Sequence, residues 1–523
     1  MDGVGAPRRR LVLTAMIFAV AMTFIDQTIV SIAAPKIQSE LGLSTAGVQW
    51  AVNSYLLALA ALFAFGGRLA DTVGHRPMVI IGVVVFAVAS ALCGLTPKGS
   101  AAEGWLVAFR ALQGAGGALM YPAALAIVVN TYELRERGRA LALFFGIAGG
   151  LTAIGPILGG YLTEWTWRAI FWVNVPVALI ALVLMAIAKP VTEHRPAPMD
   201  YRGLVLIVGG VGLSVFGFQQ STVWGWHNPG IWACIALGVV LLLVFFRVQT
   251  RTASPLMHVA LFRNRTFLAQ NVILTVAMAA FIPVFFFTSV YAEAALGKNA
   301  SQASLELLYF FLGFVVAAQI GGRMLDRVGA KRPVVLGCAV AAAGFFLWAG
   351  RVTQLSEGKI IWCIILTGAG MGLMLGQANT DAVNRAPRLE YGEATGITQT
   401  VRNYGASLGL AILGTIFSTV LQSHLTSSLT AQGVPAAEAG GQAAQISTLG
   451  SGSSGSTGGV PLFVRLDYAE ATRAVLYTMA GIMALAFLIA VRALHRGVQS
   501  EAVGESTPER DYTAASRVGG PGS

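Results

Sequence analysis

Charged side chains are scarce in this sequence, which excludes an ordinary soluble protein. Asp, Glu, Lys and Arg make up 11% of its 523 residues, whereas soluble domains carry about 25%. Hydrophobic residues make up 55%, and the mean hydropathy is +0.69. Uncharged apolar runs long enough to cross a bilayer recur along the chain. We therefore predict a polytopic helical membrane protein that lies in a lipid bilayer.

Cysteine and histidine are also rare, and neither forms a metal-binding pattern. The four cysteines, Cys93, Cys234, Cys338 and Cys363, stand singly in or beside apolar runs. They lack the paired spacing of a disulfide framework or a zinc site, so we interpret them as packing residues. The six histidines show no ligand spacing either. We predict no metal site.

Sequence patterns for nucleotide binding and catalysis are missing. The glycine clusters GAGGAL and GAGMGLMLG lie inside apolar runs and follow no strand, so they are not nucleotide loops. A Walker lysine and a serine elbow are absent, and no His, Asp and Ser residues cluster. The net charge of +11 is spread over short segments between apolar runs, which argues against nucleic-acid binding. An enzyme and an ATP-driven pump are therefore disfavoured, and we expect no cofactor.

The apolar runs predict fourteen transmembrane helices in an all-α integral membrane fold. The runs cover residues 11–33, 47–67, 78–96, 104–127, 139–162, 169–188, 203–222, 229–247, 267–290, 304–322, 333–350, 360–381, 395–420 and 472–492. The N-terminal RRR, its apolar run and SIAAP could pass for a cleaved signal peptide, but the many later runs favour a retained first span.

Basic residues predict the orientation of these spans, because short cytoplasmic loops retain Lys and Arg. With the N-terminus inside, Lys and Arg concentrate on the inner segments throughout the chain. The outer segments hold only Lys36, Lys98, Arg168, Lys298, Arg351, Lys359, Arg465 and Arg473. Both termini are therefore predicted to be cytoplasmic.

An internal repeat defines the predicted domains. GGRLADTVGHRPMVIIG at residues 66–82 returns as GGRMLDRVGAKRPVVLG at residues 321–337. The matching positions lie 255 apart: Gly67, Arg68, Asp71 and Gly74 with Gly322, Arg323, Asp326 and Gly329. Eight spans separate the copies, so two six-helix halves flank two inserted helices. The predicted units are a cytoplasmic N-terminus (1–10), a first six-helix bundle (11–188), a linker (189–202), two inserted helices (203–247), a second linker (248–266), a second bundle (267–492) with an outer Gly/Ser-rich loop (421–471), and a disordered cytoplasmic tail (493–523).

This arrangement, together with several motifs, resembles the major facilitator superfamily. GRLADTVGHRP resembles its loop signature, with His75 in place of a basic residue, and RALQGAGGALMYP resembles its fourth-helix arginine motif. FIDQTIVSIAAPKI and GIAGGLTAIGPILGGYL resemble the first-helix and antiporter motifs of its fourteen-span drug:proton antiporter branch, and ATGITQTVRNYGASLGLAILGTIF resembles the thirteenth helix of that branch. The resemblance implies a proton-driven exporter without a cofactor.

Asp26 is the first candidate functional residue, because it interrupts a long uncharged run. A charged acid inside the hydrocarbon costs about 2.5 to 3.5 kcal/mol, so it faces a protein interior or a wet cavity. Arg110 is expected at a similar depth and could pair with it. Pairing favours the charged acid and burial disfavours it, so separating the two would change the protonation of Asp26. We expect proton coupling, against the alternative of a purely structural contact.

Two further motifs carry residues whose expected roles remain open. The loop residues Gly67, Arg68, Asp71, Gly74 and Arg76, with the weaker copy Asp326, either form a latch that breaks between access states or merely cap the turn, with Asp71 pairing with Arg68 or Arg76. The antiporter motif either seals the junction between the halves or simply packs helices through its small residues. Its residues are Gly146, Gly150, Gly155, Pro156, Gly159 and Gly160.

The possible substrate contacts are Gln113, Gln399, Arg402 and Asn403, with Arg402 equally compatible with a structural role. Shifting by 255 places Phe281 opposite Asp26, so the acid occurs in the first half only. We therefore expect neutral, monocationic or weakly acidic aromatic substrates, and poor export of divalent cations.

The combined prediction is a drug:proton antiporter that works by alternating access and confers multidrug or antibiotic resistance. It would be monomeric in a bacterial plasma membrane and would move small amphiphilic molecules in exchange for protons. An exporter of an endogenous metabolite or lipid and a non-transporting membrane sensor are the alternatives.

Overall fold

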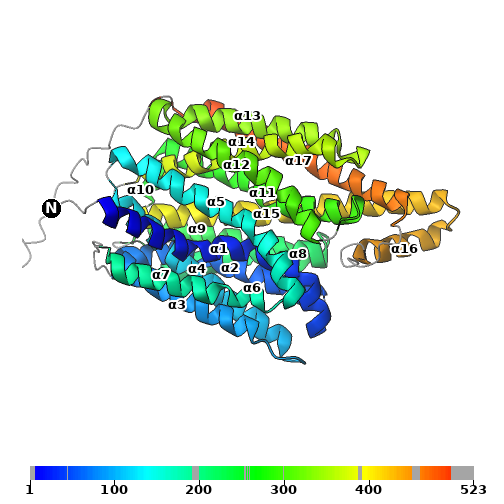
Figure 1. Cartoon of the computed structure of the whole chain (residues 1–523), viewed down its shortest axis with the longest axis horizontal. Coiled ribbons are helices and arrows are strands. Elements are labelled where there is room, and N and C mark those ends of the chain that lie inside the picture. The colour runs from blue at the N-terminus through cyan, green and yellow to red at the C-terminus, as the bar shows by residue number, and fades with distance from the viewer. Residues whose placement is uncertain are drawn as a thin grey trace, which may run out of the picture.

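The structure is a computed structural model of the chain. It describes residues 6–43, 45–132, 134–190, 200–252, 255, 257, 259–298, 300–386, 391–449, 460–495 and 497. All regular secondary structure in these residues is helical, which confirms the all-α fold class (Figure 1). Helices are expected here because a backbone in lipid has no water to bond and must satisfy its own N–H and C=O groups.

The helices run in chain order along the long axis of the molecule (Figure 1). They are α1 (Ala6–Leu41), α2 (Thr45–Val73), α3 (His75–Gly94), α4 (Ala102–Thr131), α5 (Leu134–Trp165), α6 (Ala169–Trp172), α7 (Asn174–Ala188), α8 (Tyr201–Trp224), α9 (Pro229–Gln249), α10 (Ala260–Arg263), α11 (Arg265–Val290), the π-helix η1 (Tyr291–Ala295), α12 (Ala300–Val328), α13 (Lys331–Ala349), the 3-10 helix η2 (Val352–Gln354), α14 (Glu357–Asn384), α15 (Tyr391–Ala431), α16 (Ala436–Leu449) and α17 (Leu462–Ala493).

The described helices support a multi-pass membrane protein. Twelve of them are long and apolar enough to cross a bilayer, or thirteen if a pair within α2, bent by 51°, counts as one span. Every run predicted from the sequence overlaps a helix, although the glycine-rich α5 is not among the twelve. Many helices are longer than their apolar runs, because a helix continues into the polar boundary of the membrane.

The buried apolar side chains separate according to chain order. One cluster comes from α11 to α15 and α17, and a second comes mainly from α1 to α5, α7 and α8. The two groups of helices meet where α2 packs against α15 and α5 packs against α12. Ala382, Val383, Ala394 and Ile397, near the junction of α14 and α15, pack into the second cluster and so extend this contact.

The repeat is visible in how glycines let helices approach. A Cβ added at Gly155 of α5 would lie 2.9 Å from the carbonyl oxygen of Ile25 in α1. Gly405 of α15 lies against the Thr275 carbonyl of α11 in the same way. Both partners in this pair of contacts are 250 residues apart, as are those of the next pair, which joins Gly159 to Ile29 and Gly409 to Ala279.

This spacing corrects the predicted counterpart of Asp26. With an offset of 250 for the first helix of each half, Asp26 corresponds to Val276 rather than Phe281. The sequence offset of 255 came from the loop signature, and connections of different length change the offset elsewhere. Neither counterpart is acidic, so the acid still occurs in the first half only.

The predicted outer loop 421–471 is wrong in its first part. α15 continues to Ala431, and α16 follows over Ala436–Leu449. Leu421, Leu425 and Leu429 recur at one-turn spacing on α15 and are buried in the cluster that includes α17, which explains why the helix continues. Figure 1 shows α16 and the adjoining helix ends at one end of the molecule. The Gly/Ser-rich residues 450–459 and the tail from residue 498 lie outside the described residues.

Candidate functional site

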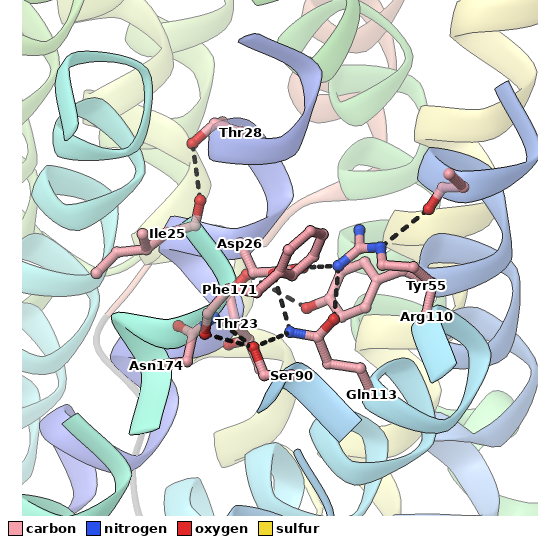
Figure 2. Close-up of polar contacts among 11 residues, drawn as sticks. Thr23, Ile25, Asp26, Thr28, Tyr55, Ser90, Arg110, Gln113, Phe171 and Asn174 are labelled. Carbon is pink, nitrogen blue, oxygen red and sulfur yellow. Dashed lines mark hydrogen bonds and ion pairs between the residues drawn. The ribbon is translucent and has the colours of Figure 1, made fainter. Parts of the chain in front are cut away.

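Asp26 lies at the centre of a buried polar network between α1 and α4 (Figure 2). Arg110 Nη1 donates to Asp26 Oδ2 at 2.5 Å, and Gln113 Nε2 donates to Asp26 Oδ1 at 2.9 Å. Arg110 Nη1 also donates to Gln113 Oε1 at 2.7 Å. Asp26 and Gln113 are 0% exposed and Arg110 is 1% exposed. The pairing expected from depth along the helices is therefore present, and it is shielded from solvent.

Two neighbouring groups hold the Arg110 guanidinium in place from the side of α2. Its Nε donates to the Ala51 carbonyl at 2.9 Å, and its carbon lies 4.5 Å from the centre of the Tyr55 ring. Tyr55 in turn donates its hydroxyl to the Thr23 carbonyl of α1 at 3.3 Å. Charge-assisted bonds and a cation–π contact thus fix the arginine that faces the acid.

The network continues to α3 and α7 through Ser90. Gln113 Nε2 and Asn174 Nδ2 donate to Ser90 Oγ at 3.2 and 3.0 Å, and Ser90 donates to the Phe171 carbonyl at 2.8 Å (Figure 2). Sequence analysis did not identify Ser90, Asn174 or Tyr55. Ser90 and Asn174 are polar residues inside apolar runs, which is the signal that could have found them. A change of charge on Asp26 would therefore be felt by four helices besides α1.

The proposed latch residues lie where α2 meets α3. Asp71 is in the last turn of α2, so the expectation that it begins the turn is wrong. Gly74 joins the helices with a φ of 113°, which favours glycine. The Asp71 Oδ1 atom lies 3.1 Å from Nε2 of His75, the first residue of α3. Asp71 is 8% exposed. Asp326, its copy in α12, is exposed and forms no ion pair among the described residues.

The antiporter motif lies along α5, and part of it packs directly beside Asp26. Gly155 faces Ile25 and Thr28 of α1, and Gly159 faces Ile29. Both contacts are within the same half, so these two glycines do not seal the junction between the halves. The remaining motif residues, Gly146, Gly150, Pro156 and Gly160, are also helical, and α5 as a whole packs on α12 of the other half.

The predicted substrate contacts on α15 lie together at the junction with α4. Gln399 Nε2 donates to the Tyr121 hydroxyl at 2.9 Å, and Arg402 Nη1 donates to Gln399 Oε1 at 3.1 Å. Asn403 Nδ2 donates to the Gln399 carbonyl at 2.8 Å within α15. Gln113, the fourth predicted contact, lies instead inside the Asp26 network. No group of three or more metal-ligating side chains occurs in the part of the chain that the structure describes.

Comparison with known families settles which fold family carries this site. A family model described as "Major Facilitator Superfamily" matches residues 16–410. The chain belongs to the major facilitator superfamily. This superfamily comprises membrane transporters, so the protein is a transporter of small molecules and not an enzyme, and such transporters generally need no cofactor.

Individual members of the superfamily are similar over most of the chain. The tetracenomycin C resistance and export protein of Streptomyces glaucescens is 35% identical over 412 residues, which are 78% of this chain and 75% of that protein. The cephamycin export protein CmcT of Amycolatopsis lactamdurans is 33% identical over 77% of this chain and 84% of its own. The solved structure of the proton:xylose symporter XylE has a TM-score of 0.60 at 12% identity, covers 94% of this chain and 97% of its own, and shows the shared fold alone.

Substituting Gly155 should disturb the transporter next to Asp26. A Val side chain at Gly155 has no room against α1, and overpacking a helix contact costs about 1–3 kcal/mol. We expect Gly155→Val to lower the thermal unfolding midpoint of the purified protein and to reduce transport. Gly481→Val is the matched control, because Gly481 of α17 has no atom within 4 Å of an added Cβ. Equal midpoints for the two variants would contradict the close contact.

Proposed function

We propose that this transporter is a proton-coupled drug exporter of a bacterial plasma membrane. The proposed topology has fourteen spans: six-helix halves at 11–188 and 267–492, two inserted helices at 203–247, and both termini in the cytoplasm. Relatives named as antibiotic export proteins support export of antibiotic-like molecules. The bias of Lys and Arg toward the predicted inner segments supports the orientation.

The observation that carries the proposal is the buried Asp26–Arg110–Gln113 network. A carboxylate at this depth exchanges charge cheaply only by taking up a proton, and its partner Arg110 stays charged. Protonation removes the negative charge that holds Arg110 and Gln113, so it loosens the contact between α1 and α4. The same network connects to α2, α3 and α7, which gives the proton a route to the arrangement of the whole first half.

The proposed cycle uses alternating access of one monomer. A proton from outside reaches Asp26 in the outward-facing state, and the halves then rock about the α2–α15 and α5–α12 contacts. Release of the proton to the cytoplasm restores the Asp26–Arg110 pair and prepares the site for a drug molecule. The proton gradient drives the cycle, and its electrical part contributes about 2.3 kcal/mol per charge per 100 mV.

Purified protein in liposomes tests the proposal directly. An imposed proton gradient should drive accumulation of an antibiotic-like dye, and a protonophore should abolish it. Dye binding without gradient-driven movement would favour the membrane-sensor alternative. Movement of a lipid or cellular metabolite but of no drug would favour the endogenous exporter.

Asp71→Asn should slow the transport cycle more than it weakens substrate binding. We propose that Asp71 holds the α2–α3 corner in one access state, since its carboxylate contacts His75 in a buried position. The amide cannot form this ion pair, so we expect a lower maximal transport rate and a substrate Kd within about twofold of wild type. Asp326→Asn is the matched control with a milder effect, because Asp326 is exposed. If Asp71→Asn lowers only the amount of folded protein, the residue is a structural cap.

A further inference from the structure

Arg402 of α15 is a cation without an anionic partner. Its printed contacts are Gln399 Oε1 at 3.1 Å from Nη1 and the Met278 sulfur at 3.9 Å from Nη2. Its Nε is buried and has no hydrogen-bond partner. Among the residues that the structure describes, no carboxylate pairs with it. The guanidinium is therefore satisfied by one amide oxygen and one weak sulfur acceptor.

Arg110 shows how the same protein treats an arginine that has a structural role. Arg110 faces the Asp26 carboxylate, a backbone carbonyl and the Tyr55 ring, and it is fully buried. Arg402 has none of these and is only partly buried. Because arginine stays charged at any physiological pH, an arginine that lacks a counter-charge in a membrane protein is costly unless an anion joins it.

The open edge of Arg402 has the shape that a carboxylate needs. Nε and Nη2 lie on one edge of the guanidinium, and these are the two nitrogens without a good acceptor. Two parallel N–H···O bonds from such an edge bind a carboxylate bidentately. Nη1, on the opposite side, is occupied by Gln399, which orients the group.

The surroundings of this edge are aromatic and lie between the two halves. Gln399 bonds to Tyr121 of α4, so α15 of the second half and α4 of the first half meet here. The Tyr121 ring packs with Phe24, Phe63 and Phe144, at centroid distances of 5.7, 5.7 and 6.5 Å. A ligand at Arg402 would thus lie beside aromatic rings at a junction that changes between access states.

We propose that Arg402 is a specificity-determining residue that binds an anionic group, a carboxylate or a phenolate, on an aromatic substrate. The inference rests on the proposed export function and adds the class of substrate to it. An exported anion leaves together with one negative charge while a proton enters. With equal proton numbers, each cycle then moves one more charge across the membrane than export of a neutral analogue, and an interior-negative potential should assist it more.

The test uses pyrene-1-carboxylate and its neutral match, pyrene-1-carboxamide, in liposomes with an imposed proton gradient. We expect wild-type protein to transport the carboxylate with the lower KM. Arg402→Gln should raise the KM for the carboxylate about tenfold or more and change that for the carboxamide less than about twofold. Arg402→Lys should retain part of the preference. Arg351→Gln removes the same charge from an arginine that lies over Trp362 at the end of α13, and it should leave both values unchanged.

A potential-dependence measurement separates substrate binding from a structural role. An interior-negative potential imposed with valinomycin and potassium should accelerate wild-type export of the carboxylate more than that of the carboxamide, and Arg402→Gln should abolish the difference. Equal losses for both probes in Arg402→Gln, or carboxamide export without carboxylate export by wild type, would overturn the inference and leave the export function standing. Failure of wild type to move either probe or a cationic dye would overturn the proposed function itself.

Discussion

Asp26→Asn is expected to abolish proton-driven efflux while the protein remains folded in the membrane. The amide has the size and polarity of the acid, and its oxygen can still accept a hydrogen bond from Arg110 or Gln113. Arg110 also keeps its bond to the Ala51 carbonyl and its contact with the Tyr55 ring. The amide cannot take up a proton, so a proton gradient can no longer act at this position.

The measurement is substrate accumulation in vesicles with an imposed pH gradient, where transport should fall to the level of empty vesicles. Asp26→Glu should retain partial activity, since it titrates but extends the carboxylate by one methylene. Asp326→Asn serves as the matched control for the loss of one acid. Efflux at the wild-type rate by Asp26→Asn would remove Asp26 from the coupling mechanism.

Arg110→Gln is expected to cause the largest loss of stability among single substitutions at the site. It leaves the carboxylate of Asp26 buried without its cation, and breaking a buried ion pair in this way costs about 3–5 kcal/mol. The thermal unfolding midpoint in detergent should fall clearly. The double variant Asp26→Asn/Arg110→Gln should recover much of the loss, because it leaves no uncompensated charge.

The recovery is what identifies the ion pair as the cause. A double-mutant cycle isolates the coupling between two residues from their separate effects. Arg351→Gln, a loss of charge outside the network, should shift the midpoint much less. If the double variant instead shows the sum of the two single losses, Asp26 and Arg110 are not coupled. The double variant should still fail to export, because it lacks a titratable group.

Several features of the fold and site could be predicted from local pattern. The helices followed from apolar runs, since a backbone in lipid is satisfied only within a helix or a closed barrel. The proximity of Asp26 and Arg110 followed from counting helical rise from the membrane surface. The family followed from motifs of fixed spacing, of which the repeated GGR loop was the most informative.

Other features depended on which helix faces meet, and pattern could not supply this. Ser90, Asn174 and Tyr55 join the Asp26 network from three different helices. The partner of Asp71 proved to be His75, the residue that departs from the loop signature. The extension of α15 to Ala431 required Leu425 and its neighbours to find a buried surface.

The sequence by itself determined that this protein is a helical membrane transporter of repeated halves with a single acid in its first apolar run. Those properties depend on hydropathy, charge and spacing, which are local quantities. Only the tertiary structure decided that Asp26 is fully enclosed by Arg110 and Gln113, that Gly155 faces α1 rather than the other half, and that Arg402 has no counter-charge. Such contacts join residues far apart in the chain, so they are set by the rotation and register of each helix against its neighbours, which apolar patterns leave undetermined.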